Sequence, residues 1–142
     1  MGEVMTVLPF QNTLSTFQTK GQTIIDALEN GVSQVEDGAG RFPQVAGLKF
    51  TWNASGEPGS RVESVEVMQD DGSYAPIDPE ATYGVVTNNY VRNGGDGYSI
   101  FETNGMNAYD FGPNLEDVVA DYIADMGGSY EPTKDDRIMK VE

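Results

Sequence analysis

The segment from Asn88 to Tyr98, NNYVRNGGDGY, gathers side chains that are suited to binding a small planar molecule. It places two aromatic rings, an amide pair and one carboxylate around three glycines. Glycine allows backbone conformations with positive φ and lets other groups approach closely. A planar ligand could stack on Tyr90, while Asn89 and Asp96 could bind its polar edge.

The residues before this segment predict the element that holds it. Residues 81–87, ATYGVVT, are rich in β-branched and aromatic side chains and predict a strand. The segment would then follow a strand end, where a rigid element can position binding residues. Structural roles remain open for the same side chains: Tyr90 could be a packing residue with a solvated hydroxyl, and Asp96 could cap backbone N–H groups. We expect Arg92, in the same segment, to be a solvated charge.

Two further blocks precede this segment, VLPFQNTL at 7–14 and RFPQVAGLKF at 41–50. With the segment at 88–98, they resemble the C-terminal domain of the 5′-nucleotidase family, which includes UDP-sugar hydrolases. The blocks follow the family's order with about its spacings, and the resemblance covers the chain from about residue 4 to residue 141. Gln11 is a departure, because the family usually has glycine at that position.

The resemblance implies a set of substrate-binding residues. In this family a nucleobase is held between two aromatic rings, which correspond to Phe10 and Tyr90 of this chain. Asn89 would bind the base edge, Asp96 would make polar contacts in the nucleoside site, and Gly94 belongs to the same motif. From its spacing alone, Phe10 would more often be a core residue, since it follows a predicted strand end.

The chain lacks the residues that would carry out phosphoester hydrolysis. It has no histidine and no cysteine, and its carboxylates do not cluster at the spacing of metal ligands. We therefore predict no catalytic residue, no metal site and no cofactor in this chain. The resemblance implies two divalent metal ions in an N-terminal metallophosphatase domain. We expect residues 1–142 to be the C-terminal domain of a hydrolase, without that N-terminal domain, and to be inactive alone.

The charge of the chain limits its partners. The formal net charge is −15, from 8 basic and 23 acidic residues, so nucleic acid and anionic membrane surfaces should be repelled. No apolar run is long enough to span a membrane. The expected partners are a nucleoside or nucleotide and the missing catalytic domain. The resemblance favours a periplasmic or secreted protein, whose signal peptide would lie upstream.

A second functional class stays open. The acidity also suits a secreted, non-catalytic interaction module or a calcium-dependent module that keeps the same fold. The GGDG sequence at 94–97 is similar to part of a calcium-binding repeat, but no second copy follows. Two facing aromatic rings favour the nucleoside-binding interpretation.

Hydrophobic periodicity predicts the elements that position these residues. Apolar positions at helical spacing predict helices over 22–35 and 115–126, the second capped by Asn114. Alternation and β-branched residues predict strands over 3–8, 13–19, 48–52, 61–69, 74–77, 82–88 and 136–141, and residues 101–113 are expected to be a loop. The predicted fold class is α+β, a single domain with a mixed β-sheet structure and two main helices packed on it.

Overall fold

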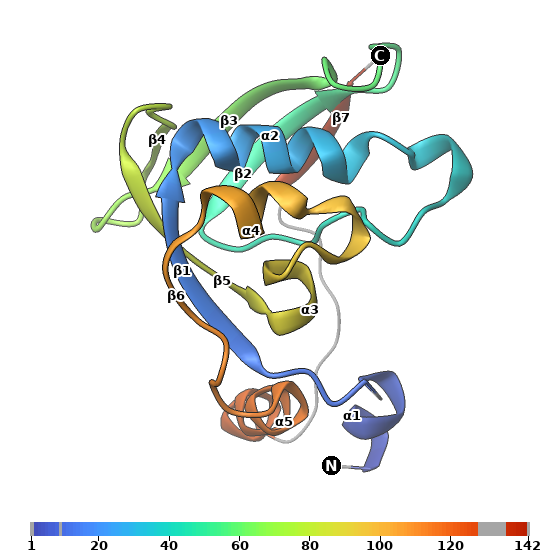
Figure 1. The fold of residues 1–142 in the computed structure, drawn as a ribbon, viewed down its shortest axis with the longest axis vertical. Coiled ribbons are helices and arrows are strands. Elements are labelled where there is room, and N and C mark those ends of the chain that lie inside the picture. Colours follow the sequence, from blue (N-terminus) through green and yellow to red (C-terminus); the bar gives the residue numbers. More distant parts are fainter. Residues whose placement is uncertain (1, 9, 128–135, 142) are drawn as a thin grey trace.

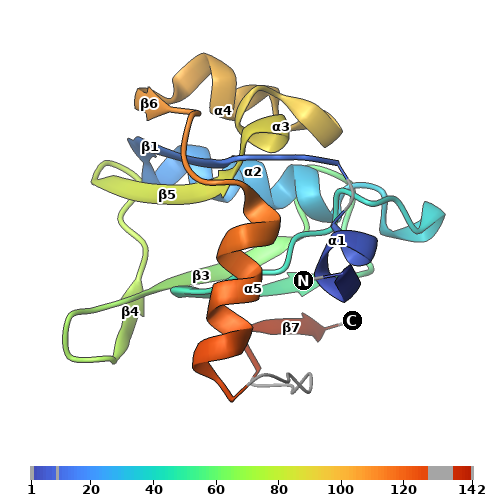
Figure 2. The ribbon, with the colours of Figure 1, turned by 90° about the horizontal axis from the view of Figure 1, so that it is seen from below.

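Two β-sheets form the framework, and one long helix lies between them (Figures 1 and 2). The computed structural model describes residues 2–8, 10–127 and 136–141. The helices are α1 (Gly2–Val7), α2 (Gly21–Val32), α3 (Asn89–Arg92), α4 (Ser99–Asn104) and α5 (Leu115–Asp125), with 3₁₀ turns η1 (Val35–Asp37) and η2 (Gly95–Gly97). The strands are β1 (Leu14–Lys20), β2 (Leu48–Asn53), β3 (Val62–Met68), β4 (Tyr74–Pro76), β5 (Thr82–Asn88), β6 (Met106–Tyr109) and β7 (Ile138–Val141).

The first sheet has three strands in the order β5-β1-β6, and all its pairs are antiparallel. Strand β1 pairs with β5 along its whole length, from Leu14 opposite Asn88 to Lys20 opposite Thr82. Alternate residues of β1 are buried, as expected for a strand with one face on the core. The predicted strand at 82–88 is confirmed residue for residue, and its end at Asn88 opens the segment of interest.

The second sheet has four strands in the order β4-β3-β2-β7. Strands β2, β3 and β4 are antiparallel neighbours, while β7 pairs with β2 in parallel. Phe50 and Trp52 point from β2 into the core, and Val65 joins them from β3. The mixed pairing and the helices confirm the predicted α+β class.

Helix α2 carries apolar groups on more than one face because it is covered from two sides. Ile24, Leu28 and Val32 pack with residues of the four-stranded sheet. Ala27 lies in a second cluster with Phe17 of β1 and with Tyr98 and Phe101 near α4. The helix predicted at 22–35 is confirmed with an earlier end, and the predicted apolar positions Ile24, Leu28 and Val32 face the four-stranded sheet.

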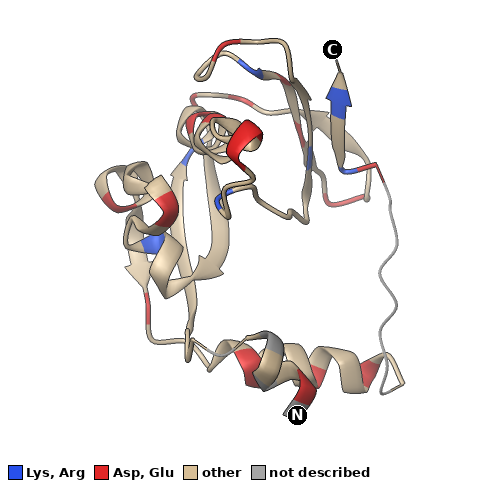
Figure 3. Ribbon diagram, turned by 90° about the vertical axis from the view of Figure 1, so that its right-hand side faces the viewer, with Lys and Arg blue, Asp and Glu red and all other residues tan. Residues whose placement is uncertain are grey.

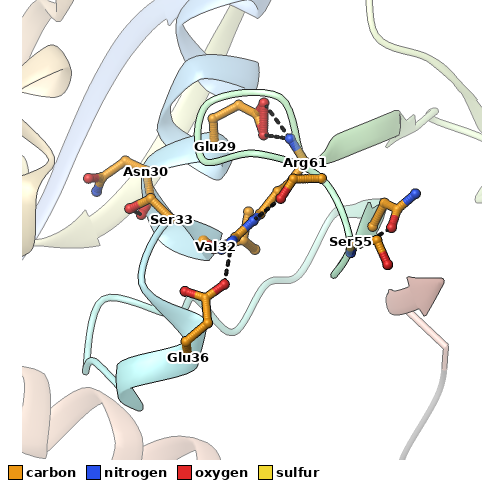
Figure 4. A network of polar contacts seen from close by, with 9 residues as sticks. Glu29, Asn30, Val32, Ser33, Glu36, Ser55 and Arg61 are labelled. Carbon is orange, nitrogen blue, oxygen red and sulfur yellow. Dashed lines mark hydrogen bonds and ion pairs between the residues drawn. The ribbon is translucent and has the colours of Figure 1, made fainter. Parts of the chain in front are cut away.

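Arg61 fastens the C-terminal end of α2 to the β2–β3 hairpin (Figure 4). Its Nη1 donates to the carbonyl of Val32 at 2.8 Å, and its Nε donates to the carbonyl of Gly56 at 2.9 Å. Its Nη2 pairs with the carboxylate of Glu36, and Glu29 accepts from the backbone N–H of Arg61 at 2.9 Å. A cation at this helix end also complements the helix dipole.

Two predictions of secondary structure were wrong. Residues 3–8, expected to form a strand, lie mostly in α1. The Leu8 N–H donates to the carbonyl of Val4 at 2.8 Å, and Glu3 in the first turn favours a helix start. Residues 101–113, expected to be a loop, contain most of α4 and all of β6. Every residue of β6 is exposed, so its sequence carries no alternation to reveal the strand.

Helix α5 lies beside α1 at one end of the molecule (Figures 1 and 3). Its prediction is confirmed, and Asn114 occupies the position before the first turn, although its side chain makes no capping hydrogen bond. The carbonyl of Asn114 accepts from the N–H of Val118 at 3.2 Å. Both helices carry acidic residues, drawn in red in Figure 3, and no basic residue lies in the last turn of α5.

Candidate functional site

The predicted site lies where β5 passes into α3. Asn88 ends the strand with extended backbone, and its side-chain oxygen accepts from the N–H of Val91 at 2.8 Å. This bond caps the single turn of α3, so the chain leaves the sheet as a short helix. The turn carries Tyr90 outward, and 53% of this side chain is exposed.

Asn89 joins this turn to the segment that carries Phe10. The Asn89 N–H donates to the carbonyl of Thr13 at 2.9 Å, and the Thr13 N–H donates to Oδ1 of Asn89 at 3.0 Å. The two segments therefore lie next to each other in the fold. Phe10 is 80% exposed, so it is not a core residue. Gln11, where the family usually has glycine, has a positive φ of 55°, a conformation that glycine adopts without strain.

The ring of Tyr90 lies against the backbone of Gly95. A Cβ atom added at Gly95 would lie 2.5 Å from Cδ1 and 2.6 Å from Cζ of this ring, well inside van der Waals contact. Only glycine leaves space for the ring in this position. One side of the Tyr90 ring is thus supported by backbone, while much of the side chain stays accessible.

Gly94 and Asp96 both have positive φ, at 98° and 55°. Gly94 adopts this conformation freely, whereas it is uncommon for aspartate. Asp96 is exposed, and within the described residues its carboxylate accepts no hydrogen bond. Its carbonyl accepts from Nδ2 of Asn30 at 3.2 Å, which ties the turn to α2. The carboxylate of Asp96 is therefore available to a ligand, although its backbone is held.

Tyr98 anchors the end of the segment in the core. Its ring stacks on Phe101 with centroids 5.4 Å apart, and its hydroxyl donates to the carbonyl of Arg41 at 2.7 Å. Burial, reinforced by the negative charge of Asp96, raises the pKa of Tyr98 to about 12, against a smaller lowering by Arg41. Arg41 also donates to Oδ1 of Asn30 at 3.0 Å. Sequence spacing gave no sign that Arg41 and Asn30 support this turn.

The expectation for Arg92 was wrong. Its side chain is only 11% exposed, and the guanidinium carbon lies 5.7 Å from the centroid of the Phe17 ring. Its Nε lies 3.9 Å from Oδ1 of Asp110. The side chain of Arg92 is largely enclosed because Arg92 ends α3 beside Phe17 of β1 and Asp110 after β6. The sequence of a glycine-rich segment does not reveal this direction.

A second pair of exposed aromatic rings flanks the segment that carries Phe10. Tyr109 is 57% exposed and Phe111 is 81% exposed, and their rings meet edge to face at 6.2 Å. The Thr13 hydroxyl donates to the carbonyl of Asp110, between them, at 2.5 Å. Sequence reasoning missed these rings because residues 101–113 were expected to be a plain loop.

A cavity of about 1040 Å³ reaches the same segment from the direction of α5. Val91, Asp96 and Tyr98 line one wall, while Val119 and Tyr122 of α5 contribute to another. The other predicted site residues do not line it. The exposed rings of Phe10 and Tyr90 therefore lie outside this cavity, although both the rings and the cavity lie next to the glycine-rich segment.

In the part of the chain that the structure describes, no group of three or more acidic side chains could hold a metal ion. Together with the lack of histidine in the sequence, this donor set does not fit a two-metal hydrolytic centre. None of the described helices has both the length and the apolar character needed to cross a membrane.

Comparison with known proteins gives consistent matches. The family model described as 5′-nucleotidase, C-terminal domain, matches residues 1–103. The trifunctional nucleotide phosphoesterase protein YfkN of Bacillus subtilis is 40% identical over 141 residues, which are 99% of this chain and 10% of that protein. A 5′-nucleotidase of Diplobatis ommata is 33% identical over 142 residues, covering 98% of this chain and 24% of that protein.

The fold is also found in a solved structure. A 5′-nucleotidase precursor from Thermus thermophilus superposes with a TM-score of 0.92 at 44% identity, over 99% of this chain and 27% of that one. The chain thus spans between a tenth and about a quarter of the length of these three proteins.

Proposed function

Because the chain belongs to the family of 5′-nucleotidase C-terminal domains, we propose that it is the substrate-binding domain of a phosphohydrolase that acts on nucleotides. In this proposal residues 1–142 bind the nucleoside part of the substrate. Hydrolysis belongs to a metal-dependent N-terminal domain of a longer protein, where two divalent ions would polarise the phosphate and activate water. Relatives such as the snake venom 5′-nucleotidase of Naja atra support an exported protein, secreted or periplasmic.

The observation that carries the proposal is the placement of two exposed aromatic side chains on hydrogen-bonded neighbouring segments. Phe10 and Tyr90 are 80% and 53% exposed, and Thr13 and Asn89 join their segments by a pair of hydrogen bonds. Exposed rings cost hydration free energy unless a partner covers them. A nucleobase stacked on such rings contributes about 1–3 kcal/mol per ring.

The polar residues complete a nucleoside site. Oδ1 of Asn89 is already bonded to the Thr13 N–H, so this amide would offer its Nδ2 as a donor to an acceptor on the base edge. The carboxylate of Asp96 would accept from ligand hydroxyl or N–H groups. Gly94 gives the turn the positive φ that presents Asp96.

The phosphate should contribute no affinity to this domain. Arg92 of the segment faces Asp110 at 3.9 Å, and Arg41 donates to Oδ1 of Asn30. The net charge of −15 repels an anion. We therefore expect adenosine to bind with a dissociation constant of roughly 1 mM, and AMP to bind no more tightly.

An NMR titration of the ¹⁵N-labelled chain with adenosine and with AMP tests the proposal. Shifts should concentrate at residues 10–13 and 89–97, and Tyr90→Ala should abolish them. Tyr74→Ala is the control, since Tyr74 is also a tyrosine but lies on β4, in the four-stranded sheet. The pure chain should release no phosphate from AMP with added Mn²⁺ or Zn²⁺. If neither ligand shifts these resonances at saturating concentration, the non-catalytic interaction module becomes the better interpretation. Tighter binding of AMP would instead reveal a phosphate site.

A further inference from the structure

A closed ring of contacts, referred to below as the circuit, joins three segments: the one that carries Phe10, the one that carries Tyr90 and the one after β6. Asn89 bonds to Thr13, and the Thr13 hydroxyl donates to the carbonyl of Asp110 at 2.5 Å. The side chain of Asp110 then faces Nε of Arg92 at 3.9 Å. Arg92 and Asn89 are the two ends of α3, so the circuit closes through the single helical turn that bears Tyr90.

The Arg92–Asp110 pair is more enclosed than the exposed ion pair at the opposite end of the same sheet. The two side chains are 11% and 27% exposed, whereas those of the Lys20–Glu80 pair are 58% and 84% exposed. Nε and Nη1 of Arg92 and Oδ1 of Asp110 are buried without a hydrogen-bond partner in the described structure. Buried charges are tolerated when an opposite charge is close, so each side chain restricts where the other can lie.

Other groups also enclose the guanidinium of Arg92. The Phe17 ring of β1 lies under it at 5.7 Å, and a Cβ atom at Gly105 would lie 3.7 Å from its Cζ. A rotation of α3 would have to pull this group out of its pocket and leave Asp110 unpaired. The cost of that separation opposes any displacement of Tyr90 from Gly95.

We propose that Arg92 and Asp110 are positioning residues, which hold α3 so that the Tyr90 ring stays over Gly95 and beside the segment of Phe10. Neither side chain is expected to touch the ligand. The consequence for nucleoside binding rests on the proposed function above, but the consequence for the free protein does not.

The first test uses the free protein. Arg92→Met and Asp110→Asn remove the charge at similar volume, and Lys20→Met is the control for an exposed ion pair. Aromatic ¹H–¹³C spectra should show changed Tyr90 ring shifts, and ¹⁵N relaxation dispersion should detect new exchange at residues 89–97, in both test variants. The Trp52 resonances, which report on the other core cluster, should stay in place. Unchanged Tyr90 shifts and dynamics in folded variants would overturn the proposal.

The second test measures adenosine affinity. Each single variant should bind about five- to ten-fold more weakly than the unsubstituted chain, and the double variant should bind no more weakly than the worse single variant. Arg92→Lys, which keeps the charge, should bind within about two-fold of the unsubstituted chain. Additive losses in the double variant would contradict a shared role for the pair. If Arg92→Met fails to fold, Asp110→Asn and Arg92→Lys still decide the question.

The two proposals fail separately. If the unsubstituted chain does not bind adenosine, the nucleoside-site proposal fails, while the free-protein spectra still test the role of Arg92 and Asp110. If adenosine binds through Tyr90 but both charge-removing variants bind it normally, only the positioning role is refuted.

Discussion

Replacing Gly95 with alanine should weaken nucleoside binding without unfolding the domain. The new Cβ atom would lie 2.5 Å from Cδ1 and 2.6 Å from Cζ of Tyr90, whereas carbon atoms pack best at about 3.5–4.0 Å. The ring must therefore move by roughly 1 Å or change its rotamer. The backbone does not resist the change, because φ of Gly95 lies outside the positive range.

The expected change in affinity follows from the stacking energy of the Tyr90 ring, and the expected change in stability follows from the lower entropy of the unfolded chain. One stacked base is worth about 1–3 kcal/mol, so losing half of this on displacement weakens binding by up to about ten-fold. A dissociation constant near 1 mM would rise to about 10 mM at that limit. Alanine reduces the freedom of the unfolded chain by about 0.4–1 kcal/mol, which offsets much of the strain from the displaced ring. The urea midpoint should hence change little.

NMR titration with adenosine measures the affinity, and urea denaturation followed by the fluorescence of Trp52 measures the stability. Gly40→Ala is the matched control, because a Cβ atom at Gly40 meets nothing within 4 Å and its φ is also outside the positive range. Gly95→Ala should move the Tyr90 ring resonances in the absence of ligand. Ring shifts and adenosine affinity equal to those of Gly40→Ala would refute the reasoning.

Three further substitutions, at Arg61, Glu36 and Tyr98, test side chains that hold the fold together. Arg61→Met should lower the free energy of unfolding by about 3 kcal/mol, since it removes the bonds to Val32 and Gly56 and leaves a buried carbonyl unpaired; an unchanged urea midpoint would contradict this. The hydrogen bond from Arg61 lowers the pKa of Glu36 from its usual 4.5, so its stabilising effect is present above pH 4.5 and is lost as the pH falls toward the lower folded value. The difference in urea midpoint between the unsubstituted chain and Glu36→Gln should accordingly shrink between pH 7 and pH 3. Burial raises the pKa of Tyr98 from 10.0 to about 12, so its contribution is complete below pH 10 and declines as the pH rises through 12. An ultraviolet titration of the folded protein should show one tyrosine ionising near pH 12 that is missing in Tyr98→Phe.

The sequence predicted the elements whose apolar residues recur at a regular period. Strand β5 and helix α2 were found because their apolar residues face a core at the period of a strand or a helix. The segment at 88–98 was correctly placed at a strand end, because the run of β-branched and aromatic residues stops at Asn88 and Asn89. These are features that local side-chain chemistry determines.

The elements that sequence reasoning missed are held by partners distant in the chain. Strand β6 exposes all its residues and exists because its backbone pairs with β1, about ninety positions earlier. Helix α4 is fixed by Phe101, whose ring stacks on Tyr98 and meets Phe17 at 4.9 Å. The hydrophobic period of the local sequence does not predict such contacts, because the surface against which these elements pack belongs to another segment.

The candidate site was likewise predicted only in part. The residue types that could meet a base were visible in the motif, but the environment of each side chain was not. Oδ1 of Asn89 accepts from the Thr13 N–H, which fixes the orientation of the amide and leaves its Nδ2 as a donor. Arg92 is enclosed against Phe17 and Asp110 instead of solvated, which changes it from a surface charge into a support for α3. The motif predicts which groups can bind, whereas the contacts of Thr13 and Asp110 decide how firmly Phe10 and Tyr90 can be presented to a ligand.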